Sequence, residues 1–371
     1  MPHGGAPRTT SARFQPLRYS TTFPLSPAAP VSCGMNMNDL DGAGAGGGDE
    51  EAGSAAFGGL GGISGGIENL IALAIGNTRA RVGLFEKGDL RDPVSITIGV
   101  AGSDSAAAPD PVTAAELVVA AVRRAGEAVH NAPVVVSSVN PAMADRICTA
   151  LEGEGLDVYR VGVEGGDLPI PMAHALDDAS TLGQDRLVCA FGAYRRSRQA
   201  CVVIDAGTAI TVDFVDGEGT FQGGLIAPGV AMMLRSLSEN TAQLPRVALT
   251  RPDPSRGVFG KDTKHAMLLG CVLGARGLVR HAIERFADAY GAYPQIVATG
   301  GDAVLLFEDD DLVEHIVPDL QLMGLYEVAK ASLEDEDAPG PSSRRTPLDE
   351  IGDGGDDDMT EMDDGDEEAL P

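Results

Sequence analysis

The 371-residue sequence contains no tryptophan, only 4% aromatic residues, and 27 basic side chains against 55 acidic ones. Its formal net charge of −28 argues against nucleic acid or an anionic membrane as a partner, because both carry negative charge themselves. The five cysteines are odd in number and include no C-x-x-C pair, and the six histidines include no H-x-H or H-x-x-x-H pair. We therefore expect neither a disulfide framework nor a zinc site.

The negative charge is concentrated near the C-terminus. Residues 334–371 hold 16 acidic side chains against two basic ones, which is half of the net charge, and we predict that they form a disordered acidic tail. Residues 1–66 run from an Arg/Ser/Thr/Pro-rich to a Gly/Ala-rich composition, typical of a disordered extension. The start of this extension has some transit-peptide character, but a true start at Met35 or Met37 in place of Met1 explains it as well. No apolar run approaches about 18 residues, so we expect a cytoplasmic protein.

Between these ends, apolar runs typical of strands alternate with segments of helical period, which indicates an α/β fold. We predict a first lobe over residues 67–199 and a second over 200–333. The predicted strands are Leu70–Ile75, Arg81–Phe85, Val134–Val139, Asp157–Val161, Cys201–Ile204, Ile210–Val215 and Gln295–Ala298. The predicted helices are Thr113–Val129, Gln184–Arg195, Val230–Asn240 and Asp262–Tyr290.

The second lobe begins with the same pattern as the first. Residues 73–85 and 204–214 each read as a strand, a tight glycine turn, a hydroxyl residue and a second strand. Such a repeat predicts two homologous lobes whose turns face each other across a cleft. Glycine turns with nearby hydroxyls suit a nucleoside triphosphate, because their backbone N–H groups can approach phosphate oxygens.

The body, over roughly residues 69–330, resembles the type III pantothenate kinase family, also called the Bvg accessory factor family. The motifs that carry this resemblance, in order, are Ile75-Gly-Asn-Thr78, Ser137-Ser-Val-Asn-Pro141, Gly183-Gln-Asp-Arg186, Asp205-Ala-Gly-Thr-Ala-Ile-Thr211, Gly223-Gly-Leu-Ile-Ala-Pro-Gly229, Leu244-Pro245, Gly260-Lys-Asp-Thr263, Thr299-Gly-Gly301 and Leu322-Met-Gly-Leu325. The resemblance implies two ribonuclease H-like, actin-like ATPase lobes with a cleft between them. It also implies phosphorylation of pantothenate by ATP to 4′-phosphopantothenate, at the start of coenzyme A biosynthesis.

Roles follow from the resemblance residue by residue. Asp185 is the expected proton acceptor, and a carboxylate can orient and deprotonate an alcohol. Asp205 matches the ligand of a monovalent cation, K⁺ or NH₄⁺, beside the Mg²⁺ that accompanies ATP. The expected pantothenate contacts are Gly183, Gln184, Asp185, Arg186 and Thr263. The expected ATP contacts are Ile75, Gly76, Asn77, Thr78, Arg79, Ala80, Arg81 and Thr208, and a homodimer is implied.

The sequence departs from the family at Ala74, where the first phosphate turn usually carries an aspartate. If that aspartate holds Mg²⁺ through water, its loss weakens the positioning of the metal. Residues 173–182 also lack the aromatic residue that usually contacts pantothenate. Two alternatives therefore stay open: a weak or inactive homologue that binds ATP or pantothenate for regulation, and a related sugar or acetate-type kinase of the same superfamily.

Overall fold

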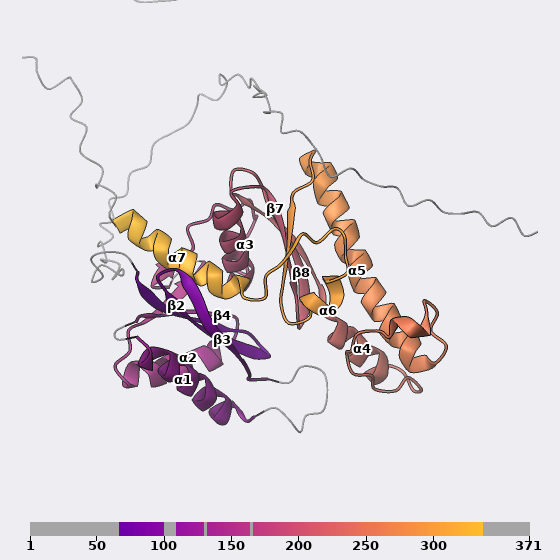
Figure 1. The fold of residues 1–371 in the computed structure, drawn as a ribbon, viewed down its shortest axis with the longest axis horizontal. Coiled ribbons are helices and arrows are strands. Elements are labelled where there is room, and N and C mark those ends of the chain that lie inside the picture. The colour runs from indigo at the N-terminus through magenta and orange to yellow at the C-terminus, as the bar shows by residue number, and fades with distance from the viewer. Residues whose placement is uncertain (1–66, 100–108, 130–131, 164–165, 337–371) are drawn as a thin grey trace, which may run out of the picture. The chain divides into compact units, whose positions relative to one another are not determined.

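The computed structural model describes residues 67–99, 109–129, 132–163 and 166–336 (Figure 1). The predicted extension over residues 1–66 and all but the first three residues of the predicted acidic tail lie outside the described residues. The described residues hold two mixed β-sheets with helices packed against them.

The first sheet has the strand order β3-β2-β1-β4-β5-β6. Strand β2 is antiparallel to both β1 and β3, whereas β1, β4, β5 and β6 run parallel to one another. The strands are β1 (Asn69–Ile75), β2 (Arg79–Glu86), β3 (Asp89–Thr97), β4 (Val134–Ser138), β5 (Val158–Gly162) and β6 (Leu168–Pro169).

The second sheet repeats this arrangement, in the order β9-β8-β7-β10-β11. Strand β8 is antiparallel to β7 and β9, and β10 is parallel to β7 and β11. The strands are β7 (Cys201–Ala206), β8 (Ala209–Val215), β9 (Phe221–Pro228), β10 (Gln295–Thr299) and β11 (His315–Ile316). Both sheets therefore contain the ribonuclease H-like order of five strands, which confirms the predicted duplication.

Several helices begin after a residue whose side chain caps the first turn. Asp110 accepts hydrogen bonds from the N–H groups of Val112 and Thr113, and Asp262 accepts one from His265 N–H. The helices are α1 (Pro111–Glu127), α2 (Pro141–Gly153), α3 (Gln184–Ser197), α4 (Val230–Glu239), α5 (Thr263–Tyr290), α6 (Ala303–Phe307) and α7 (Leu320–Glu336), with a 3₁₀ turn at Pro254–Arg256.

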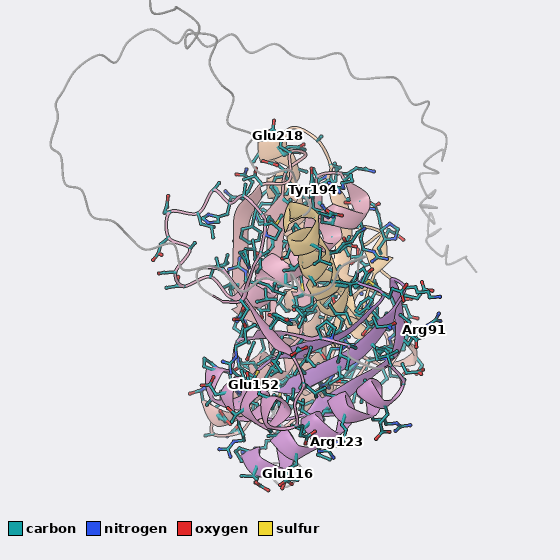
Figure 2. The ribbon with its side chains drawn as sticks, turned by 90° about the vertical axis from the view of Figure 1, so that its left-hand side faces the viewer. Arg91, Glu116, Arg123, Glu152, Tyr194 and Glu218 are labelled. Atoms are coloured by element: carbon teal, nitrogen blue, oxygen red, sulfur yellow. The ribbon has the colours of Figure 1, made fainter. Side chains whose placement is uncertain are left out.

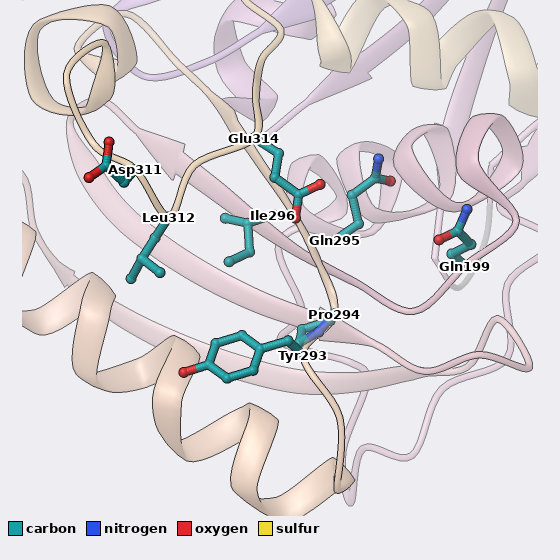
Figure 3. Close-up of a pocket in the computed structure, with 8 residues that line it drawn as sticks. All are labelled: Gln199, Tyr293, Pro294, Gln295, Ile296, Asp311, Leu312 and Glu314. Carbon is teal, nitrogen blue, oxygen red and sulfur yellow. The ribbon is translucent and has the colours of Figure 1, made fainter. Parts of the chain in front are cut away.

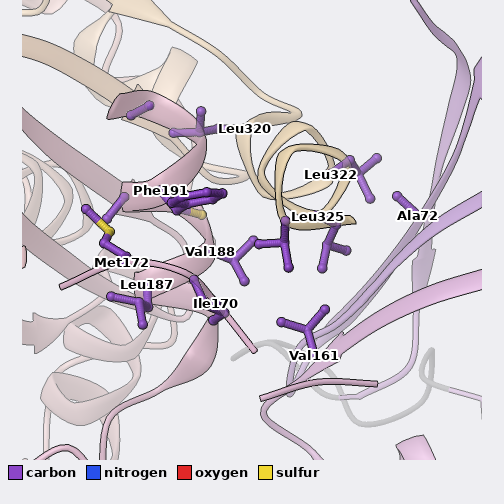
Figure 4. Packing of buried hydrophobic residues seen from close by; sticks show 14 of the residues in the cluster. Ala72, Val161, Ile170, Met172, Leu187, Val188, Phe191, Leu320, Leu322 and Leu325 are labelled. Carbon is purple, nitrogen blue, oxygen red and sulfur yellow. The ribbon is translucent and has the colours of Figure 1, made fainter. Parts of the chain in front are cut away.

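Three apolar clusters hold these elements together. One packs α1 and α2 on the first sheet, and another packs α4, α5 and α6 on the second. The third is shared: α3 contacts β7 and β8 of the second sheet, while α7 contacts β1, β2 and β4 of the first (Figure 4). Charged side chains such as Glu116, Arg123 and Glu218 are exposed on the outside (Figure 2). Because α7 packs on the first sheet, it belongs to the first lobe although it follows the second in sequence. Local sequence periodicity did not predict this placement.

Helices α3 and α7 cross at two glycines. A Cβ added to Gly192 would lie 2.8 Å from Gly324 Cα, and a Cβ on Gly324 would overlap the carbonyl oxygen of Val188. Only glycine at both positions lets the two backbones approach this closely. The Leu322-Met-Gly-Leu325 motif therefore has a packing role at the junction of the lobes.

Candidate functional site

The two glycine turns meet at the carboxyl ends of β1 and β7. Gly76 N–H donates to Arg79 C=O and Gly207 N–H to Ala209 C=O, each over 2.9 Å, which closes the two turns. The hydroxyl oxygens of Thr78 and Thr208 lie 2.7 Å apart and share a hydrogen bond. The two residues predicted to contact ATP from opposite lobes are therefore adjacent.

The remaining residues of the first turn form its hairpin. Ile75 and Ala80 are cross-strand partners and both are fully buried, so they offer backbone groups and not side chains to a ligand. The Arg79 guanidinium lies against Gly301 in the Thr299-Gly-Gly301 motif, 2.7 Å from where a Cβ of Gly301 would stand. Gly300 has φ +94°, and a Cβ there would overlap both Ala206 C=O and the Asp205 carboxylate. This motif therefore packs directly on the second turn.

Asp205 stands at the end of β7 among other acids. Desolvation, followed by repulsion from Asp185 and Asp213, raises the pKa of Asp205 to about 7. Arg81 opposes this rise. A cation beside Asp205 would favour its ionised form, as the predicted cation site requires.

Asp185 lies in the first turn of α3, directly after the helix begins at Gln184. Burial raises the pKa of Asp185 above the ordinary aspartate value, against the hydrogen bond that its carboxylate accepts from Arg186 N–H over 2.9 Å. Gly183 leaves room for this carboxylate, since a Cβ there would lie 2.6 Å from Asp185 Oδ1. Gln184 Nε2 donates to Ser138 C=O, which ties the start of α3 to β4.

Arg186 is committed to a partner within the chain. Its Nε donates to both carboxylate oxygens of Asp213 on β8, over 3.0 and 3.2 Å, and Nη2 donates to the same carboxylate. The Asp213 side chain is only 2% exposed, and the guanidinium lies 5.8 Å from the Phe221 ring centroid. This geometry fixes Arg186 beside Asp185. Sequence reasoning missed Asp213, although an acid inside the apolar strand Ile210–Val215 was a usable signal.

Thr263 lies on a different helix from Asp185. It is the exposed first residue of α5, and among the described residues no hydrogen bond joins it to α3. No set of three or more His, Cys, Asp or Glu side chains in the described part of the chain is arranged to hold a metal ion.

A cavity of about 280 Å³ lies elsewhere, at the opposite end of β10 (Figure 3). Gln295 and Ile296 at the start of that strand line it, together with Tyr293 and Glu314. The phosphate turns follow the other ends of the strands, so this cavity is separate from the group around Asp185.

A model of the family described as type III pantothenate kinase matches residues 70–285. A type III pantothenate kinase of Saccharopolyspora erythraea is 31% identical over 265 residues, covering 69% of this chain and 96% of the relative. One from Akkermansia muciniphila is 39% identical over 206 residues, covering 54% of this chain and 78% of the relative.

Among solved structures, a ROK hexokinase from Thermus thermophilus aligns with a TM-score of 0.40 and 16% identity over 71% of this chain and 99% of that one. The fold assignment rests on the two sheets themselves. The family model covers both turns and Asp185. The chain belongs to the type III pantothenate kinase family.

Proposed function

We propose that this protein transfers the γ-phosphoryl group of ATP to the primary hydroxyl of pantothenate, giving 4′-phosphopantothenate at the start of coenzyme A biosynthesis. The observation that carries the proposal is the contact between the two phosphate turns, through Thr78 and Thr208, beside the buried acids Asp185 and Asp205. A nucleotide at the turns would present its terminal phosphate to a group that can accept a proton.

In this proposal Asp185 orients the pantothenate hydroxyl and accepts its proton as the bond to phosphorus forms. Burial raises the pKa of Asp185, which makes the ionised carboxylate a stronger base. Arg186, held by Asp213, keeps a positive charge beside this carboxylate. Gly183 and Gln184 shape the pocket wall at the start of α3, and Thr263 adds a hydroxyl contact to pantothenate.

For the metal sites, we propose that Mg²⁺ arrives with ATP and supplies charge neutralisation at the phosphates. We also propose that K⁺ or NH₄⁺ binds at Asp205. Desolvation and neighbouring acids hold the pKa of Asp205 near 7, and a bound monovalent cation would favour the ionised carboxylate.

We propose a homodimer that forms through α5. Gly270, Gly274 and Gly277 follow one another at helical spacing, and a Cβ at any of them would meet open space. Leu273 beside them is 60% exposed. Leu273→Glu should give a monomer by light scattering, whereas Leu117→Glu on α1, where the leucine is 49% exposed, should leave the dimer intact.

We place the reaction in the cytoplasm. Within the described residues α5 is long and apolar enough to cross a membrane, and 44% of its most apolar window is buried inside the protein. The four described cysteines, Cys148, Cys189, Cys201 and Cys271, are buried free thiols.

The test is a coupled assay of ADP release by the full chain with Mg²⁺ and K⁺. The acceptors compared are pantothenate, acetate and a hexose. Release that requires pantothenate supports the proposal, and release with only acetate or hexose would assign a related kinase. Ala74 favours one further candidate, a regulatory binding protein, and tight ATP binding without turnover on any acceptor would establish it.

A further inference from the structure

Ala74, where the sequence departs from the family, lies between polar residues on the two neighbouring strands. Ala74 pairs with Arg81 on β2 and with Ser137 on β4. Directly paired residues share a face of the sheet, so the three side chains line one row. This row belongs to the face that carries Ala72 and Val135, which is the face covered by α7.

The second sheet shows what the same row contains in the other lobe. Asp205 pairs with Thr211 on β8 and with Thr299 on β10. A carboxylate thus stands between two hydroxyls in the second lobe. In the first lobe a methyl group stands between a guanidinium and a hydroxyl. Compared with the second lobe, this row therefore lacks a carboxylate and carries a guanidinium.

The methyl group of Ala74 leaves polar atoms beside it without a hydrogen bond. Ser137 is fully buried and its Oγ has no partner, and Arg81 Nε is also buried without one. A carboxylate at residue 74 would accept from such donors, whereas a methyl group cannot. The first turn therefore offers donors to an anion and no acid to a divalent cation, and its residues do not fit a metal ion.

The rest of the Arg81 side chain is fixed in place. Nη1 donates to Pro318 C=O over 2.6 Å, and Nη2 forms an ion pair with Asp319, at the residues just before α7. A guanidinium has five N–H donors, so further donors stay free, and the side chain remains 25% exposed. A positioned guanidinium of this kind matches the geometry of phosphate oxygens.

We propose that Arg81, held by Asp319 and Pro318, supplies the positive charge for the ATP phosphates at the first turn, in place of a divalent ion held by an acid at residue 74. Arg81 then binds the nucleotide directly, and Asp319 acts as a positioning residue. The inference rests on the proposed function, because it assigns the phosphates of ATP to these turns.

The experiment measures ATP affinity by calorimetry on the full chain, once with Mg²⁺ and once with EDTA. The native chain should bind ATP in EDTA within about tenfold of its affinity with Mg²⁺. Arg81→Gln should weaken binding in EDTA by about 10- to 100-fold, the range of a charge-assisted hydrogen bond. Arg91→Gln, which removes a charge from the exposed end of β3, is the matched control and should change neither affinity.

Ala74→Asp provides a second, independent variant. The added acid should pair with Arg81 and Ser137, weaken ATP binding in EDTA, and leave binding dependent on Mg²⁺. Native binding that needs Mg²⁺ by more than about 100-fold, or an unchanged EDTA affinity in Arg81→Gln, overturns the inference while pantothenate-dependent turnover still stands. Absence of ATP binding in both buffers overturns the proposed function as well.

Discussion

Replacing Asp205 by asparagine should stabilise the ligand-free protein at high pH. Asp205 is partly buried, and desolvation together with Asp185 and Asp213 raises its pKa from the ordinary 3.8 to about 7. Asparagine keeps the shape of the side chain and removes the charge that this environment disfavours. An acid that weakens the fold is expected at a functional site and not at a structural one.

The magnitude follows from the two pKa values. Since a tenfold change in proton affinity corresponds to about 1.4 kcal/mol, ionised Asp205 costs at most about 4 kcal/mol, and less if remaining solvent contact screens it. The unfolded chain loses this proton near pH 4 and the folded chain near pH 7. Stability therefore falls as pH rises between these values and levels off above them. Asp205→Asn should gain about 2–4 kcal/mol at pH 8 and below about 1 kcal/mol at pH 4.5.

The assay is urea unfolding of both proteins at pH 4.5 and pH 8 without K⁺. Asp216→Asn is the control, because its sign should be opposite. Burial would raise the pKa of Asp216, but hydrogen bonds from Thr220 N–H, Gln222 and Glu218 N–H lower it, so that variant should lose stability. An equal gain for Asp205→Asn at both pH values, or a loss at pH 8, would refute the reasoning.

The remaining predictions concern the monovalent cation, the proposed base Asp185, the ion pair between Arg186 and Asp213, and the crossing of α3 and α7. K⁺ should raise the melting temperature of the native chain more at pH 8 than at pH 5, and an identical rise in Asp205→Asn would contradict binding at that residue. Asp185→Asn should lower kcat by about 10²- to 10⁴-fold with an unchanged circular dichroism spectrum, and near-native kcat would remove Asp185 from its role. Asp213→Asn should destabilise the protein by about 3–5 kcal/mol in urea unfolding because it removes the carboxylate that the buried Arg186 guanidinium contacts, and a change below about 1 kcal/mol would show that the pair is not structural. Gly324→Ala should cost about 1–3 kcal/mol by overpacking against Val188 C=O, whereas Gly153→Ala at the end of α2, with open space at its Cβ, should be neutral or stabilising; equal effects would argue against the close crossing.

Much of the fold could be predicted because its signals are local. The two hairpins of β1–β2 and β7–β8 follow from apolar runs around glycine turns, and α5 from a long helical period, within a residue or two of the observed ends. Strand β3 escaped because it lies at an edge, is mostly exposed and contains Pro93. Helix α2 had an unused signal, since Asn140 followed by Pro141 is a capping residue before a favoured first position.

The site depended on contacts that no local pattern encodes. Arg186 meets Asp213, and Arg81 meets Asp319, across long stretches of sequence. Each pair forms because α3 packs on the second sheet and α7 on the first. Periodicity indicates which face of a helix is apolar but not which sheet it covers, so these partners could not be predicted from spacing.

Direct detection of 4′-phosphopantothenate tests whether this chain phosphorylates pantothenate. The full chain is incubated with ATP, Mg²⁺, K⁺ and pantothenate, and 4′-phosphopantothenate is quantified by mass spectrometry beside the Asp185→Asn variant. We expect the product to increase with time for the native chain and to fall at least about 100-fold in the variant. No product from a folded native chain that binds ATP, or equal product from both proteins, would contradict it.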